Sequence, residues 1–176
     1  MYLVSIYFDE ETNKTINRYI QQVAKQTENT FMLDGKVPPH ITISAFESLN
    51  EEMVLQVLEK SVEGMRSGEL QWVSIGTFLP HVIFLQPVLN RYLHQLQEQV
   101  YETIQVAGDS KISAMYQPFQ WLAHTTIGKT LEKGQMKEAF LTLQNSFVPF
   151  AGQVVKIGLA KTNPYTEIKN WDLERK

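Results

Sequence analysis

Residues 38–44 read PPHITIS, which puts an ionisable ring at the start of a run that is typical of a buried strand. Side chains two positions apart in a strand lie on the same face, so His40 and Thr42 point one way while Ile41 and Ile43 point the other. The isoleucine face is expected to enter the core. The other face either packs His40 inside the protein or presents it, with Thr42, to a ligand.

A second stretch of the same form lies in the other half of the chain. Residues 121–128 read WLAHTTIG, in which His124 and Thr126 share one face of an expected strand and Ile127 lies on the other. The chain has 4 histidines, and two of them stand in the pattern His-x-Thr. One such pattern mostly reflects packing, whereas two copies at matching places favour a shared function.

The segments around the two patterns follow the same order in each half: strand, long helix, loop, histidine strand, helix, strand, strand. Hydrophobic periodicity predicts strands at 2–8, 40–46, 70–79, 82–88, 121–128, 152–162 and 167–174. It predicts helices at 9–27, 50–65, 89–105 and 131–146, with Asn50 as an N-cap, and loops at 29–39 and 106–120.

This repeated order predicts an α/β (α+β) fold that forms a single bilobal domain over residues 1–176. The pseudo-repeats would cover about 1–80 and 81–176. We expect two antiparallel-rich sheets with helices outside and a cleft between the lobes, related by a pseudo-twofold axis. Each lobe would then bring one imidazole and one hydroxyl to the cleft.

The composition excludes several kinds of site. The chain has no cysteine, so it holds no disulfide, no thiolate zinc site and no cysteine nucleophile. A net charge of −3 argues against a surface that coats nucleic acid. No stretch approaches the roughly 20 apolar residues of a membrane span, and the acidic start is unlike a secretory signal. We expect a cytoplasmic monomer that does not bind a membrane.

Two imidazoles and two hydroxyls around one point suit phosphodiester chemistry. One neutral histidine can take a proton from an attacking water, and the other, protonated, can give one to the departing oxygen, since the usual pKa of about 6.5 allows both forms. The threonine hydroxyls can donate to the non-bridging phosphate oxygens. This chemistry needs no metal and no cofactor, and the chain has no His-Glu-x-x-His zinc motif.

The paired stretches HITI and HTTI resemble those of the 2H (two-histidine) phosphoesterase superfamily, particularly its bacterial 2'-5' RNA ligase-like branch. The resemblance covers nearly the whole chain and includes the PPHIT stretch, Phe46, Lys129 and the late VVKIGLA…Y…WDL run. It implies a bilobal duplicated α/β fold and metal-free action on 2',3'-cyclic phosphates, 2'-5' linkages or related cyclic nucleotides. The implied catalytic positions are His40, Thr42, His124 and Thr126.

Two positions depart from the family pattern. Thr125 stands where the family usually has an aliphatic residue, and Lys129 stands where close relatives often have arginine. A lysine offers a point charge instead of a two-pronged guanidinium, so a specific phosphate clamp does not carry over. Further candidates for substrate binding are Lys129, Phe46, Trp121 and Tyr165, although aromatic residues near strands mostly belong to the core.

The sequence thus predicts a metal-independent phosphodiesterase. Its substrate would be a 2',3'-cyclic or 2'-5'-linked phosphodiester of a nucleotide or RNA end, cleaved by paired histidine acid–base catalysis. Two alternatives stay open: a non-catalytic module that binds the phosphate of a nucleotide or RNA end, and a 2'-5' RNA ligase. The pattern names neither the physiological substrate nor which histidine is the acid.

Overall fold

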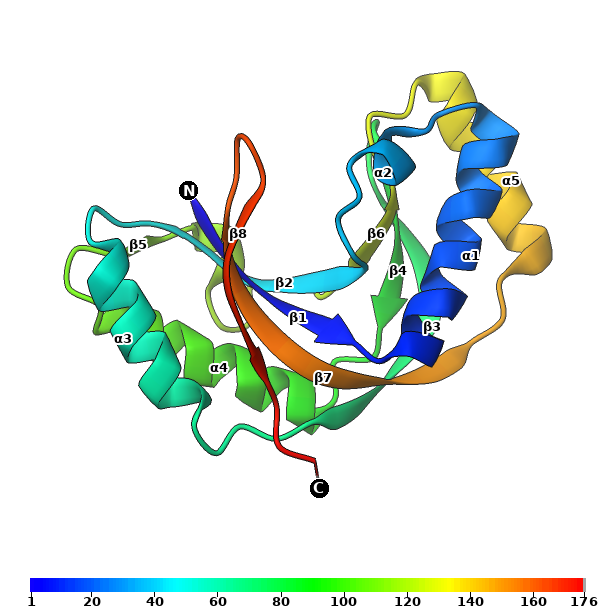
Figure 1. The fold of residues 1–176 in the computed structure, drawn as a ribbon. Helices are drawn as coiled ribbons and strands as arrows, with labels where there is room; N and C mark the ends of the chain where they lie inside the picture. Colours follow the sequence, from blue (N-terminus) through cyan, green and yellow to red (C-terminus); the bar gives the residue numbers. More distant parts are fainter. Residues whose placement is uncertain (176) are drawn as a thin grey trace.

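The computed structural model describes residues 1–175, which form eight strands and five α-helices in an α/β fold (Figure 1). The strands are β1 (Tyr2–Phe8), β2 (His40–Glu47), β3 (Gly68–Phe78), β4 (Val82–Pro87), β5 (Lys111–Ile112), β6 (Thr125–Gly128), β7 (Phe150–Lys161) and β8 (Thr166–Asp172). The helices are α1 (Glu10–Thr27), α2 (Phe31–Asp34), α3 (Glu51–Val62), α4 (Arg91–Gln105) and α5 (Lys133–Ser146). A short 3₁₀-helix, η1, covers Ala114–Tyr116.

The predicted helices and strands are present, with differences at their ends and inside the loops. The side chain of Asn50 accepts a hydrogen bond from the Met53 amide, as an N-cap of α3 does. The expected loops contain short elements, namely α2 in the first loop and β5 and η1 in the second. β6 begins at Thr125 instead of residue 121, so His124 immediately precedes the strand.

All the strands belong to one antiparallel sheet, in the order β5-β2-β1-β7-β3-β4-β6, with β8 paired to β7. The expectation of two sheets is wrong in this respect. Strand β7 is 12 residues long, and its two ends pair with different neighbours: Val154–Lys161 with β1 and Phe150–Val154 with β3. One long strand therefore joins the two halves of the sheet.

Without β5 and β8, the sheet order β2-β1-β7-β3-β4-β6 is symmetric: β2 corresponds to β6, β1 to β4 and β7 to β3. The helices do not stay with the strands that precede them. Helices α1 and α5 pack together against β6 and β4, while α3 and α4 pack together, with α4 against β2 (Figure 1). Each half of the sheet therefore contains elements from both halves of the chain. The division into pseudo-repeats near residue 80 stays a prediction.

The core confirms which face of each histidine strand is buried. Ile41, Ile43, Thr125 and Ile127 have no exposed surface, whereas His40 remains half-buried on the opposite face of β2. The alternation in burial read from the sequence thus holds at Thr125–Ile127 of β6, whereas in β2 Thr42 and Ser44 on the other face are buried as well. Among residues 1–175, no helix is long and apolar enough to cross a membrane.

Candidate active site

The two histidine strands meet although they are not hydrogen-bonded to each other. Strands β2 and β6 stand near opposite ends of the sheet order, and they contact one another because the sheet curves. His40 is the first residue of β2, and His124 comes directly before β6. The two histidines therefore stand at matching places at the start of two strands that contact each other.

Each imidazole is held by the same local hydrogen bond. The Nδ1 atom of His40 lies 2.9 Å from the Pro38 carbonyl oxygen, and Nδ1 of His124 lies 2.8 Å from the Leu122 carbonyl oxygen. A carbonyl oxygen only accepts, so Nδ1 carries a proton and donates it in both rings. This arrangement leaves Nε2 of each ring free to accept or to give a proton.

The surroundings disfavour the charged form of both rings. Burial lowers the pKa of His40, the hydrogen bond to the Pro38 carbonyl opposes that shift, and the nearby charges of His124 and Lys129 lower the pKa further. Burial also lowers the pKa of His124, against the hydrogen bond to the Leu122 carbonyl.

The three threonines of the two motifs have different surroundings. Thr42 Oγ1 lies 3.2 Å from Ser5 Oγ, on the face of β2 that His40 shares. Thr126 is half-buried beside His124. Thr125 is fully buried on the opposite face, where its Oγ1 accepts a hydrogen bond of 3.1 Å from Trp72 Nε1. This departure from the family pattern satisfies a buried indole N–H.

Three of the four further candidates lie around the histidines. Lys129 is exposed, close enough to affect the pKa of His40, and its Nζ lies 5.8 Å from the centre of the Phe31 ring. Trp121 Nε1 donates to the Thr42 carbonyl at 3.0 Å. The Tyr165 hydroxyl lies 3.1 Å from that of Tyr7, whose ring centre is 6.1 Å from that of His40.

Phe46 is not available to a ligand. Its ring is 1% exposed and stacks on Tyr2 at 5.5 Å, within the core. It takes the packing role that aromatic residues near strands mostly have, so its candidacy as a substrate-binding residue is wrong.

Aromatic residues that the sequence did not single out surround the histidines. The ring of Phe78 meets His124 edge-on at 4.9 Å, and Phe84 lies 5.2 Å from it. Tyr7 stands opposite His40 in the pairing of β1 with β2. Nothing in their local sequence distinguishes these three residues from core aromatics, because their role depends on which strands pair.

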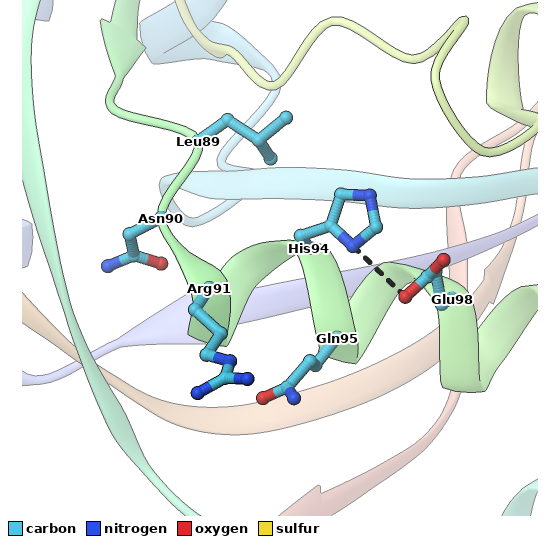
Figure 2. A pocket seen from close by; sticks show the side chains of 6 residues that line it. All are labelled: Leu89, Asn90, Arg91, His94, Gln95 and Glu98. Carbon is cyan, nitrogen blue, oxygen red and sulfur yellow. Dashed lines mark ion pairs between the residues drawn. The ribbon is translucent and has the colours of Figure 1, made fainter.

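A cavity of about 540 Å³ lies beside His124, lined by Phe78, Met115, Tyr116, Gln120, Trp121, Leu122 and His124. Three of these residues belong to the second expected loop, and three more lie just after it, at positions 121–124. A separate hollow of about 410 Å³ lies along the first turns of α4, where His94 pairs with Glu98 at 3.0 Å (Figure 2). None of the residues that line this hollow lines the cavity beside His124.

Within residues 1–175, no three His, Cys, Asp or Glu side chains gather as a metal-binding group.

Replacing Gly76 with alanine is expected to displace His124. Gly76 stands opposite Phe84 in β3 and β4, and a Cβ atom there would come within 2.2 Å of the Phe84 ring. That ring is 2% exposed and packs on His124, so it has little room to move. We expect a loss of about 1–3 kcal/mol of stability and an NMR-titrated pKa of His124 closer to its ordinary value.

Gly134→Ala is the matched control, because nothing lies within 4 Å of a Cβ at that helical position in α5. It is expected to raise stability by about 0.4–1 kcal/mol and to leave the His124 titration unchanged. An unchanged His124 titration in Gly76→Ala would mean that Phe84 does not hold the ring.

Comparisons with known proteins agree on one fold. A family model described as "2'-5' RNA ligase superfamily" matches residues 10–165. The chain is similar to TT0787 of Thermus thermophilus, with a TM-score of 0.64 and 16% identity over 99% of this chain and 98% of that one. It is similar to E. coli LigT complexed with 3'-AMP, with a TM-score of 0.60 and 16% identity over 98% and 97%.

Other E. coli LigT structures that resemble the chain are complexed with NADP+ and with ATP. A more distant likeness is to Usb1 of Kluyveromyces marxianus, with a TM-score of 0.51 and 10% identity over 94% of this chain and 96% of that one. No curated protein sequence matches the chain. At these identities, the likeness to solved structures concerns the fold.

Proposed function

Because this chain belongs to the 2'-5' RNA ligase superfamily, we propose that it is a metal-independent phosphodiesterase that uses His40 and His124 as its acid–base pair. The substrate class is a 2',3'-cyclic or 2'-5'-linked phosphodiester of a nucleotide or RNA end. The observation that carries the proposal is the matched Nδ1 hydrogen bonds of the two rings to Pro38 and Leu122. They leave two Nε2 atoms for proton transfer in one site.

In the proposed reaction, the neutral histidine accepts a proton at Nε2 from the attacking water. The protonated histidine donates the proton on its Nε2 to the ribose oxygen as the bond from that oxygen to phosphorus breaks. After one turnover the two rings have exchanged their protonation states, and exchange with solvent restores them. The lowered pKa of both His40 and His124 favours the neutral form that the base requires.

Charge on the phosphate oxygens increases as the water attacks. The hydroxyls of Thr42 and Thr126 are proposed to donate to the non-bridging oxygens, where a fixed donor stabilises the transition state. Lys129 adds a positive charge on the His40 side. A bound phosphodiester carries a negative charge, which would raise the pKa of both histidines and help to protonate the one that acts as the acid.

A nucleotide substrate is supported by the ligands in the related LigT structures, which are named as 3'-AMP, ATP and NADP+. A module that only binds phosphate would have no use for two free Nε2 atoms, because positive charge and hydroxyl donors suffice for binding. Ligation would need a 5'-hydroxyl to attack a 2',3'-cyclic phosphate in place of water, forming the 2'-5' linkage as the ribose P–O bond breaks, and no contact within residues 1–175 favours that reaction. Hydrolysis is therefore the activity to test first.

The purified protein is expected to hydrolyse 2',3'-cyclic nucleotides or 2'-5'-linked dinucleotides, and to keep this activity after exhaustive chelation. The physical reason is that two imidazoles supply both proton transfers without a metal-bound water. Product formation is measured by chromatography with and without EDTA. Loss of activity in EDTA that zinc or manganese restores would contradict the mechanism. Binding of nucleoside monophosphates without turnover of any of these substrates would favour the binding module.

A further inference from the structure

The two histidine strands belong to one sheet, but no sheet hydrogen bond joins them. In the strand order, β1, β7, β3 and β4 stand between β2 and β6, and yet β2 and β6 contact each other (Figure 1). Their separation therefore depends on the curvature of the sheet over four intervening strands. Both proton transfers of the proposed reaction act on one phosphodiester, so a contact outside the sheet is needed to hold this separation.

One side chain provides such a contact. Trp121 is half-buried three residues before His124, and its Nε1 donates to the carbonyl oxygen of Thr42 at 3.0 Å. Within residues 1–175, this is the only hydrogen bond between β2 and residues 121–128. Thr42 comes two residues after His40, so the bond joins the two segments close to both histidines.

The carbonyl that accepts this bond lies on a part of β2 that has no strand beside it on the side away from β1. Strand β5 pairs with β2 only at the last two residues of β2, which leaves residues 40–45 without a strand partner there in the described chain. Residues 113–121 contact this edge instead. The amide of Ser113 donates to the Ala45 carbonyl at 2.9 Å, and Trp121 makes the second contact, at Thr42.

The segment that carries Trp121 is itself anchored. Gln97 of α4 is 2% exposed, and its Nε2 donates to the Tyr116 carbonyl at 2.8 Å. On the other side of Trp121, the Leu122 carbonyl accepts the bond from Nδ1 of His124 at 2.8 Å. The indole is therefore held within a fixed segment, and a shift of this segment would move the ring of His124.

We propose that Trp121 is a positioning residue of the catalytic pair, because its indole N–H bond to the Thr42 carbonyl sets the separation of His40 and His124. This inference rests on the proposed function. Catalysis by two groups on one phosphodiester depends steeply on geometry, since a displacement of about 1 Å can cost roughly 10²-fold in rate. Trp121 acts through the two strands, and this role needs no contact between the indole and the substrate.

Trp121→Phe tests the bond, because phenylalanine keeps an aromatic ring and lacks the N–H. We expect kcat for a 2',3'-cyclic nucleotide to fall roughly 10- to 100-fold, while KM stays unchanged. Trp171→Phe is the matched control, since Nε1 of Trp171 in β8 is buried and has no hydrogen-bond partner within residues 1–175. It is expected to leave both kcat and KM unchanged, and circular dichroism checks the folding of each variant.

A second background separates positioning from a general loss of stability. In a His40→Ala protein no pair remains to be aligned, so adding Trp121→Phe is expected to leave the residual kcat unchanged. A side chain that only stabilises the fold would lower kcat by the same factor in both backgrounds. That equal factor, a loss confined to KM, or an unchanged kcat in the folded Trp121→Phe variant would each overturn the inference while the hydrolase stands.

If the wild type hydrolyses no substrate, NMR titration of His40 decides. A charge on His124 lowers the pKa of His40 by an amount that falls as the two rings move apart. The pKa of His40 is measured with and without His124→Ala, in both the Trp121→Phe and the Trp171→Phe proteins. A smaller effect of His124→Ala with Trp121→Phe than with Trp171→Phe would support the positioning role without the hydrolase. An equal or larger effect, or none in either protein, would overturn it.

Discussion

His40→Ala and His124→Ala are each expected to lower kcat about 10²–10⁴-fold, which is the usual contribution of a general acid or base. Both rings present a free Nε2 because their Nδ1 atoms hydrogen-bond to backbone carbonyls, so alanine removes a proton carrier. The measurement is the initial rate of hydrolysis of a 2',3'-cyclic nucleotide at saturating concentration. Circular dichroism checks that each variant is folded.

The double variant distinguishes a pair from two independent sites. Because the two histidines serve the same proton-transfer step, we expect His40→Ala with His124→Ala to be only slightly slower than the slower single variant. His94→Ala is the control, since His94 lies on α4 and pairs with Glu98 away from the site. It should keep wild-type activity. Losses that multiply in the double variant would contradict the acid–base pairing.

The pH dependence of kcat/KM also distinguishes the single histidine variants from the wild type. A plot of wild-type kcat/KM against pH is expected to be bell-shaped. The rate falls at low pH because the base becomes protonated, and it falls at high pH because the acid loses its proton. Burial lowers the pKa of both His40 and His124 from 6.5, so the midpoint of the bell should lie on the acidic side of that value. Each single variant should lose one limb. A full bell in both variants would show that other groups titrate.

Thr126→Val is expected to lower kcat about 10²–10³-fold, as the loss of one donor to a developing negative charge does. Valine keeps the shape of the side chain, and Thr126 makes no side-chain hydrogen bond within residues 1–175, so stability should change little. Thr42→Val should cost a similar factor. It should also cost about 1–3 kcal/mol of stability, because it leaves the buried Ser5 hydroxyl without the Thr42 partner.

Thr125→Val is the matched control, one residue away and on the opposite face of the strand. Its hydroxyl accepts the buried indole N–H of Trp72, so valine is expected to destabilise the fold by about 1–3 kcal/mol and to spare kcat. The rates of hydrolysis and the free energies of unfolding in urea are measured together. Thr125 lies on the face away from the proposed phosphate position. If Thr125→Val slowed the reaction as much as Thr126→Val, the loss in Thr126→Val could not be assigned to a hydrogen bond from Thr126 to the phosphate.

Local pattern was enough to predict the elements and the faces of the two histidine strands. The period of two in HITI and HTTI assigns Ile41, Ile43 and Ile127 to the core, and all three are fully buried. Asn50 stands at the start of a helical pattern and is therefore predicted as an N-cap, and its side chain does accept the hydrogen bond from the Met53 amide. Such features depend on neighbours within a few residues, and the sequence gives those neighbours in order.

The family, the α/β class and the two His-x-Thr faces could thus be predicted from the chain of amino acids alone. The pairing of β7 with both halves of the sheet, the packing of Phe46 on Tyr2 and the bond of Thr125 to Trp72 emerged only in three dimensions. So did the cavity that loop residues form beside His124. These contacts join segments distant in the chain, and a strand of a given pattern can pair with several partners until the whole core selects one.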